Sequence, residues 1–524
     1  MAPSDILVSS DHHKMNASPP ARRAYSHFGE NKAHAALGRD SLRSGVALVA
    51  ARGINMVVQL GSMILLARLL NPHDYGLVAI VFALVGFAPM LIDLGTTDAT
   101  VQRKSITHTD VSALFWIKIA IAGTLTLLLV AASSSIASFY GEPALTSIAL
   151  ASSLTLLLTA MSTQHFALMR RAMQFRRMAT IEILANVVSS IVAILMALTG
   201  WGYWALVAKP ILASAVSAVG AWVSCPWLPG RPQVTQGSKE MVVFGMRVTG
   251  FTMTDYFAGS ADRIMLGYFY GAGPLGYYQN AVLLYDNVLG LVARLHDVAV
   301  ASLSKLGDDV AQLKASWSAA LSSLSFFSML AFAIIAVIGR DLVVVLLGEK
   351  WAPAGPLLCI FAVKGVAHVV ERTLGWLHVA AGRPDRWMRW GFVGSLLQLG
   401  ALLIGTAFGL VGVATAHAIA TFCLFLPALV YAGRPFNIGA GDVLRAVGPQ
   451  MVAALSAVAI GIVVQEVFLA DLSRLARIVV SASICLAAYL LVAVGLFRVT
   501  RPLQLAASLL HDFSAIRLRA KGTG

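Results

Sequence analysis

Seven basic residues of this chain stand inside long apolar segments, where charged side chains are rare. They are Arg52, Lys118, Lys209, Arg247, Arg294, Lys364 and Arg372. A charge at the centre of a lipid bilayer costs roughly 3 kcal/mol on insertion scales. Each of these side chains therefore needs a hydrated cavity, a bound anion or a neighbouring acid, and together they are the first candidates for binding an anionic ligand.

Polar and acidic side chains accompany several of these cations at helical spacing. The four sets are Arg52, Asn55, Gln59 and Ser62; Arg247, Thr254 and Asp255; Asn280, Asn287 and Arg294; and Lys364, His368 and Glu371, with Arg372 beside them. Steps of three, four and seven residues place side chains on one face of a helix. The sequence therefore predicts four helices with a polar face, on which Gln59, Asn280 and Asn287 would donate hydrogen bonds to a phosphate or a sugar.

Acidic residues inside the apolar segments balance only part of this positive charge. We set against it five acids, Glu182, Asp255, Asp286, Asp297 and Glu371. The surplus of cations predicts a hydrated lumen that attracts anions, in which Asp255, Asp286 and Glu371 are candidate coupling-ion sites. Some cations could instead form internal salt bridges, as Lys364 would with Glu371. Arg52 and Arg247 could also extend to the membrane interface.

Membrane-spanning helices are the elements that must position these residues. From Phe392 to Gly433 the chain runs for 42 residues without Asp, Glu, Lys or Arg. A hydrocarbon core about 30 Å thick takes ~20 apolar residues in a helix, so this run holds two spans. The same pattern predicts an all-α polytopic membrane protein with 14 transmembrane helices. Their approximate limits are 44–68, 75–97, 112–136, 145–168, 179–200, 203–227, 240–264, 276–300, 316–346, 354–379, 387–408, 410–432, 446–468 and 475–497.

The distribution of charge predicts that both termini face the cytoplasm. In that orientation the cytoplasmic loops hold fifteen Lys and Arg residues, and the outer loops hold six. An excess of Lys and Arg on the cytoplasmic side is the rule for membrane proteins. Topology therefore explains the net charge of +14, and we expect no nucleic-acid partner.

Local similarity at an offset near 200 residues predicts an internal repeat. Residues 64–67 match 264–267, Gly76 matches Gly276, and residues 200–205 match 409–414. Because six spans is an even number, both copies would start in the cytoplasm as parallel repeats. The predicted division is a cytoplasmic tail at 1–42, a six-helix lobe at 43–230, a second six-helix lobe at 231–436, two further helices at 437–498 and a cytoplasmic tail at 499–524. Within the last tail, apolar residues from Leu503 to Ile516 recur at helical spacing, which indicates an amphipathic helix or a frayed end.

Motifs for other kinds of chemistry are missing from the sequence. It contains no G-x-x-x-x-G-K-[ST] phosphate loop, no Cys or His set at metal-ligand spacing, and no N-terminal signal peptide. The outer loops are short, whereas a membrane-embedded polymerase or ligase that acts on lipid-linked sugars usually has a long one. We therefore expect no cofactor, no metal site and no enzymatic activity.

Several strings near the helix ends resemble those of Wzx-type polysaccharide flippases. They are Leu66-Ala67-Arg68-Leu69-Leu70 with Tyr75-Gly76, Asp93-Leu94-Gly95 with Val101-Gln102-Arg103-Lys104, Ser304-Lys305-Leu306-Gly307-Asp308-Asp309, and Gly348-Glu349-Lys350-Trp351 with Pro356. The strings keep the family's order and similar spacing over residues 40–500. A proline that is common just before the third string is replaced here by Ala301 or Ser302. The chain thus resembles the colanic-acid and succinoglycan-type exporters of the multidrug/oligosaccharidyl-lipid/polysaccharide superfamily.

This resemblance implies a fourteen-helix fold with two six-helix lobes around a central cavity. It implies translocation of a polyprenyl-diphosphate-linked oligosaccharide across the bacterial inner membrane, by alternating access of the lobes, for exopolysaccharide or lipopolysaccharide biosynthesis. The partners would be that substrate, membrane lipid, a polysaccharide polymerase and chain-length or export proteins. Two alternatives stay open, a drug/cation antiporter of the same superfamily and a membrane-embedded O-antigen polymerase or ligase. The antiporter would need an acidic cavity, whereas these spans are net basic.

Overall fold

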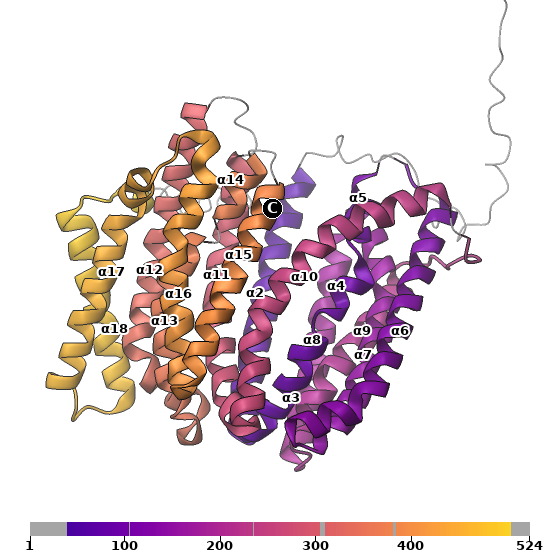
Figure 1. Ribbon diagram of the computed structural model, residues 1–524, viewed down its shortest axis with the longest axis horizontal. Coiled ribbons are helices and arrows are strands. Elements are labelled where there is room, and N and C mark those ends of the chain that lie inside the picture. The colour runs from indigo at the N-terminus through magenta and orange to yellow at the C-terminus, as the bar shows by residue number, and fades with distance from the viewer. Residues whose placement is uncertain are drawn as a thin grey trace, which may run out of the picture. The chain divides into compact units, whose positions relative to one another are not determined.

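Helices account for all the regular secondary structure that the computed structural model describes (Figure 1). The described residues are 39–103, 105–233, 235–303, 310–371, 373–380 and 384–504. The long helices are α2 (Arg39–Leu69), α3 (Pro72–Val85), α6 (His108–Tyr140), α7 (Ala144–Arg171), α8 (Phe175–Leu198), α9 (Trp204–Ser224), α10 (Gln236–Tyr270), α11 (Ala272–Leu303), α12 (Val310–Leu347), α13 (Ala354–Glu371), α15 (Pro384–Thr406), α16 (Gly409–Gly433), α17 (Ala440–Phe468) and α18 (Arg474–Leu490). The short ones are α4 (Ala88–Asp93), α5 (Thr96–Gln102), α14 (Leu374–Ala380), the 3-10 turns η2 (Glu349–Trp351) and η3 (Arg434–Phe436), and the π-helical turn η4 (Leu491–Leu496). The predicted all-helical class is confirmed for this part of the chain.

Eleven helical segments in the described ranges are long and apolar enough to cross a membrane. They coincide with the predicted spans two to six and nine to fourteen. The other three predicted spans fall on α2, α10 and α11, which have 31, 35 and 32 residues and carry three of the four predicted polar stripes. Large apolar side chains such as Leu127, Val223 and Leu403 are exposed, as is expected of side chains that face lipid tails.

The second predicted span, 75–97, is broken into three pieces. Helix α3 ends at Val85, α4 runs from Ala88 to Asp93, and α5 begins at Thr96. Pro89 lies in the first turn of α4, and it has no N–H to continue the hydrogen bonding of α3. After α4, Leu94 and Gly95 both take left-handed backbone conformations, with φ values of 47° and 62°. The chain therefore reaches its next loop through a sharp turn rather than along one helix.

Small residues let the helices of the C-terminal half approach closely. A Cβ added at Gly365 of α13 would lie 2.6 Å from the ring of Phe332 in α12, and one at Gly461 of α17 would lie 2.7 Å from Val337 in the same helix. Helix α12 thus packs against both α13 and α17. In a bilayer, the hydrophobic effect does not favour contact between helices over contact with lipid. Close van der Waals packing of this kind therefore holds the helices together.

The chain forms two compact units, each assembled from separate stretches of sequence. Unit 1 comprises Met1–Met63, Val85–Ser138 and Pro143–Met253, and unit 2 comprises Ile64–Leu84, Phe139–Glu142 and Thr254–Gly524. Helices α2 and α10 each begin in unit 1 and end in unit 2. Nearly all of the predicted N-terminal tail, the string at 304–309 and the C-terminal residues after 504 lie outside the described residues.

Within unit 2, the first turns of α3 and α11 pack against each other through glycines that are 200 positions apart. A Cβ at Gly76 would lie 1.7 Å from the carbonyl oxygen of Ala272, and one at Gly276 would lie 1.8 Å from that of Pro72. Only glycine allows two backbones to come so close. The contact is reciprocal between residues 72–76 and 272–276, whereas the repeat itself stays a prediction from the sequence.

Candidate functional site

A polar face in unit 1 joins α2, α8 and α9. The ammonium of Lys209 in α9 donates to the hydroxyl of Ser62 at 2.6 Å. Asn186 of α8 donates from Nδ2 to both the Oδ1 atom and the backbone carbonyl of Asn55, at 3.1 and 3.2 Å. Gln59, on the same stripe of α2, is exposed, and Lys209 is half-buried. The stripe predicted on α2 therefore meets polar side chains of two other helices, beside a lysine that solvent can reach.

Local sequence explains the shape of α9 next to this lysine. Pro210 lies inside the helix, and it lacks the N–H that would bond the carbonyl of Leu206. A freed carbonyl of this kind needs a partner when it lies at membrane depth, which neighbouring polar side chains or water can supply. The position of Lys209 directly before the proline thus places the cation where the helix is weakest.

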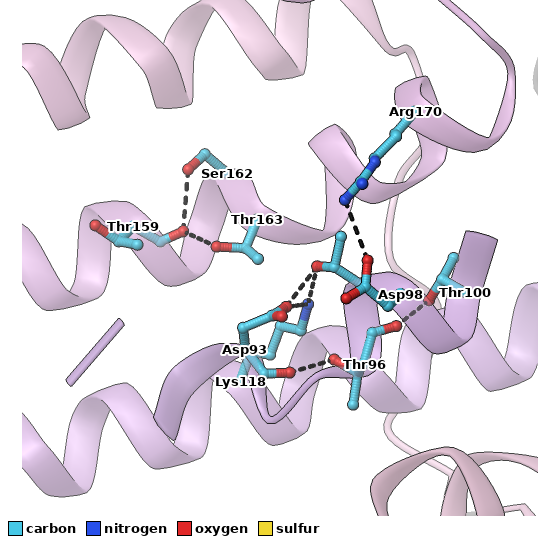
Figure 2. A network of polar contacts seen from close by, with 10 residues as sticks. Asp93, Thr96, Asp98, Thr100, Lys118, Thr159, Ser162, Thr163 and Arg170 are labelled. Atoms are coloured by element: carbon cyan, nitrogen blue, oxygen red, sulfur yellow. Dashed lines mark hydrogen bonds and ion pairs between the residues drawn. The ribbon is translucent and has the colours of Figure 1, made fainter. Parts of the chain in front are cut away.

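Lys118 is buried against the turn that follows α4 (Figure 2). Its Nζ atom lies 3.0 Å from Oδ1 of Asp93 and 3.5 Å from the hydroxyl of Thr97, which itself donates to the same carboxylate oxygen. The Lys118 side chain is only 1% exposed. A buried ion pair is unfavourable unless further hydrogen bonds complete it, and the hydroxyl of Thr97 supplies one to the carboxylate. This lysine has a partner within its own unit.

Two acids that lie inside predicted spans, Asp93 and Asp262, are absent from the five set against the cations in the sequence. Asp93 stands near the end of span 75–97, within one of the strings that resemble the flippases. Asp262 stands at the end of span 240–264; it is buried in unit 2 and accepts a hydrogen bond from the hydroxyl of Tyr278 at 2.7 Å. Counting every acid within the span limits would have found both, but the same count also adds cations such as Arg68 and Arg263, so it does not reduce the surplus of positive charge.

Helices α11, α13 and α16 bury a second polar cluster, in unit 2. The Nζ atom of Lys364 lies 3.0 Å from Nε2 of His417, and the hydroxyl of Tyr285 lies 2.6 Å from Nδ1 of His368. The Lys364 ammonium also lies over the Tyr285 ring, 5.6 Å from its centroid. Lys364 is 8% exposed. The polar stripe predicted on span ten therefore faces α11 and α16, and its two first members each have a partner there.

The stripe predicted on α11 is only partly described. The amide of Asn280 points to its own helix, 3.5 Å from the Gly276 carbonyl, and that of Asn287 donates to the Leu283 carbonyl at 2.7 Å. Asn280 is fully buried, and its Oδ1 atom has no partner among the described residues. Tyr285, which the sequence reasoning did not select, is the residue of α11 that meets Lys364.

The structure describes the side chains of only some of the remaining predicted site residues. Asp286 is exposed and Glu371 is half-buried. Four others lie in described helices, but their side chains are outside the description: Arg52, Arg247, Asp255 and Arg294. Arg372 lies outside the described residues. Among the residues that are described, no three His, Cys, Asp or Glu side chains come together as metal ligands would.

The first and fourth of the resembling strings bind each other in unit 2. Arg68 donates from its guanidinium to the carbonyls of Leu346 and Val345 at 2.9 and 2.6 Å. In return, Lys350 and Trp351 donate to the last carbonyls of α2 at 2.9 and 2.7 Å. The last carbonyls of a helix have no partner inside it, so the ends of α2 and α12 satisfy each other. The α2–α12 clasp consists of Ala67, Arg68, Val345, Leu346, Lys350 and Trp351.

Further contacts surround the α2–α12 clasp. The ring of Tyr75 meets that of Trp351 edge-on, with 5.2 Å between centroids. Glu349 accepts hydrogen bonds from the guanidinium of Arg474, which holds the pKa of that carboxyl below its usual value. Burial lowers the pKa of Lys350, although its ammonium keeps a carbonyl acceptor. The strings thus have a structural role, because they join helix ends that are distant in the sequence.

A family whose members are described as polysaccharide biosynthesis proteins matches residues 65–356, more than half of the 524 residues. The chain belongs to this family. The membership confirms the resemblance found from the loop strings. It also agrees with the α2–α12 clasp, since both strings that form it lie inside the matched range.

Three relatives carry names from the biosynthesis of surface polysaccharides. The lipopolysaccharide biosynthesis protein WzxC of Escherichia coli (strain K12) is 24% identical over 372 residues, which cover 69% of this chain and 73% of that protein. The teichuronic acid biosynthesis protein TuaB of Bacillus subtilis (strain 168) is 24% identical, covering 65% and 71%. The succinoglycan biosynthesis transport protein ExoT of Rhizobium meliloti (strain 1021) is 23% identical, covering 66% and 70%.

Solved structures of flippases and transporters share the fold. The lipid II flippase MurJ in an inward closed conformation aligns with a TM-score of 0.70 at 15% identity, over 86% of this chain and 99% of that one. An inward-facing multidrug resistance transporter of the MATE family, from the MOP superfamily, aligns with a TM-score of 0.57 at 14% identity, over 74% and 98%. At these identities the likeness concerns the fold alone.

Proposed function

We propose that this membrane protein translocates polyprenyl-diphosphate-linked oligosaccharides from the inner to the outer leaflet of the bacterial inner membrane, for exopolysaccharide or lipopolysaccharide biosynthesis. The proposal rests on family membership and fold taken together. A chain of the polysaccharide biosynthesis family has the fold of a lipid II flippase over 99% of that structure. The names of WzxC and ExoT point to the same class of cargo.

The diphosphate is the charged part of this substrate, and it is the part for which crossing the bilayer without the protein is most costly. Lys209 is the best-supported contact for it, because this lysine is half-buried and its described hydrogen bond goes to a neutral hydroxyl. Exposed Gln59 and the nearby Asn55 and Asn186 would donate to sugar hydroxyls or phosphate oxygens. A cation that keeps one hydrogen bond to serine can exchange it for a phosphate oxygen at little cost.

We further propose that the chain has 14 transmembrane helices in two six-helix lobes with two additional C-terminal helices. The lobes would rock around a cationic cavity while the lipid tail stays in the bilayer, which is the usual logic of alternating access. The cavity would include Arg52, Arg247, Arg294 and Arg372. Lys118 and Lys364 have partners in their own units. Their charges would contribute to the positive potential of this cavity.

A drug or cation antiporter is the second candidate, because the MATE transporter shares the fold. The two functions differ in what the polar face of α2, α8 and α9 should bind. A face that carries Lys209 suits an anion, whereas an exported organic cation needs an acid. Binding of a short-chain lipid diphosphate, but not of organic cations, to the purified protein would separate the two.

Deleting the gene tests the proposed function directly. In a strain without a paralogue, we expect surface polymer to be missing while early glycosyl transfer continues and lipid-linked repeat units accumulate on the inner leaflet. Normal surface polymer would refute the proposal. Sugar transfer by the purified chain alone would instead favour the polymerase or ligase alternative.

Substituting Lys209 tests the assigned contact. Lys209→Ala should lower export by about tenfold, since losing one charge-assisted hydrogen bond costs about 1.5 kcal/mol or more, while Lys209→Arg should retain much of it. Lys239→Ala is the matched control, because Lys239 is exposed near the start of α10. Export would be measured as surface polymer at matched membrane abundance, and equal export by both alanine variants would contradict the assignment.

A further inference from the structure

Lys364 and His417 can carry only one positive charge between them in the contact that the structure shows. Their nitrogens lie 3.0 Å apart, which is a hydrogen-bond distance. One nitrogen must donate, and the other must accept with a lone pair. Two protonated groups would place N–H donors face to face with no acceptor between them. The closed pair therefore binds one proton fewer than a separated lysine and histidine can bind.

The buried surroundings of the pair strongly disfavour binding of a second proton while the contact is closed. Lys364 and His417 are 8% and 9% exposed. The rings of Tyr285 and Phe361 lie 5.6 and 6.0 Å from the Lys364 ammonium. Two like charges repel far more strongly in such a poorly hydrated place than in water. A second proton would therefore break the contact rather than be accommodated within it.

Charged groups from several helices decide whether that second proton can be bound at all. Those acting on Lys364 are Asp262 and Arg263 of α10, Asp286 of α11 and Glu371 of α13 itself. Helix α12, which also packs against α13, presents the uncharged Phe332 at this level. Three acids against one arginine favour a positive charge on Lys364, whereas the charges acting on His417 are two cations, Lys364 and Arg263, which oppose its protonation while the contact is closed. The Nδ1 atom of His417 is buried without a partner among the described residues, so the histidine is the less firmly held member.

We propose that Lys364 and His417 form a proton-binding switch, in which uptake of one proton breaks their contact and frees the facing side chains of α13 and α16. The ligand is the proton itself. A histidine is suited to this task because its charge changes within roughly pH 5–8. That the switch couples proton movement to translocation rests on the proposed function, whereas the proton binding does not.

The test uses the purified full-length protein in lipid nanodiscs without any substrate. The folded form with the closed pair binds fewer protons than the unfolded chain, so its stability should rise with pH. His417→Gln keeps an acceptor for Lys364 but cannot take up a proton. Between about pH 8 and about pH 5.5, we expect the unfolding temperature of the wild type to fall by roughly 3 °C more than that of His417→Gln. Lys364→Met should reduce this pH dependence only in part, because it removes the repelling charge but leaves His417 buried.

His73→Gln is the control, since His73 is exposed in α3 of the same unit. It should keep the pH dependence of the wild type. Equal pH dependence in the wild type and in His417→Gln would overturn the switch. If the difference is found but neither protein translocates lipid-linked oligosaccharide, the switch stands and the proposed function fails. If both translocate with the same response to an imposed pH gradient, the coupling role is refuted and the function stands.

Discussion

At the scale of single residues, Lys118 shows how a cation can sit at membrane depth without a substrate. Its ammonium lies 3.0 Å from the carboxylate of Asp93, and the hydroxyl of Thr97 donates a hydrogen bond to the same carboxylate. The Asp93 side chain is 29% exposed, whereas that of Lys118 is 1% exposed. The two members of the pair are therefore unequal, and substitutions should reveal this asymmetry.

Asp93→Ala should destabilise the protein much more than Lys118→Met. Removing the acid leaves an ammonium buried without its partner, which costs about 3–5 kcal/mol. Removing the lysine leaves an acid that can still reach solvent. Chemical unfolding of the purified protein would measure both losses, with Asp98→Ala as control because its pair with Arg170 is exposed (Figure 2). Equal losses for the two members would show that the acid is as deeply enclosed as the lysine.

The sequence predicted some of these residues correctly and could not predict others. Helical spacing identified the polar face of α2 and the stripe of Lys364 and His368, because period alone decides which side chains share a face. It could not identify the partners. His417 lies 53 positions from Lys364, so only the packing of α13 on α16 brings them together.

At the scale of elements, the backbones of α3 and α11 approach each other closely at two glycines. Gly276→Ala should destabilise the protein by about 1–3 kcal/mol, because the new Cβ would meet the Pro72 carbonyl 1.8 Å away. Gly273→Ala, in the same turn of α11, has nothing within 4 Å of its new Cβ and should be neutral. Thermal unfolding of both variants in detergent checks this, and similar losses would contradict the close approach.

The α2–α12 clasp makes a separate prediction at this scale. Trp351→Phe keeps an aromatic ring but removes the donor to the Ala67 carbonyl, which lies 2.7 Å from the indole nitrogen. A carbonyl left unpaired in a buried place costs about 1–3 kcal/mol. Trp201→Phe is the control, since Trp201 is exposed. Cleavage of residues 348–353, between α12 and α13, by a protease added outside spheroplasts should become faster in Trp351→Phe alone.

Element boundaries followed from composition except where charge or proline intervenes. The long apolar runs predicted eleven spans that the structure bears out, because length and hydropathy suffice to define a span. The break of span 75–97 at Pro89 was missed, since an apolar run hides the loss of one N–H. Arg340 and Asp341 interrupt the ninth run, yet α12 continues because Asp341 pairs with Arg477 of α18.

At the scale of the whole molecule, the distribution of loop charge predicts two cytoplasmic ends. Reporter fusions after residue 20 and after residue 505 should both give a cytoplasmic signal. The reason is that fifteen loop cations would otherwise face the outside. A fusion at the loop of Lys350 should report the opposite side, and a periplasmic signal from either terminus would overturn the count of fourteen spans.

The α2–α12 clasp has a consequence for how such exporters can be recombined. All four of its hydrogen bonds end on backbone carbonyl oxygens, which every amino acid possesses. The hydrogen bonds themselves therefore do not depend on the identities of Val345 and Leu346, as long as the three donors remain, whereas Ala67 is also held by burial. A chimera that takes its first hairpin from one relative and its remaining helices from another should still close this joint, so the joint itself does not oppose the exchange of gene segments between relatives that keep the three donors.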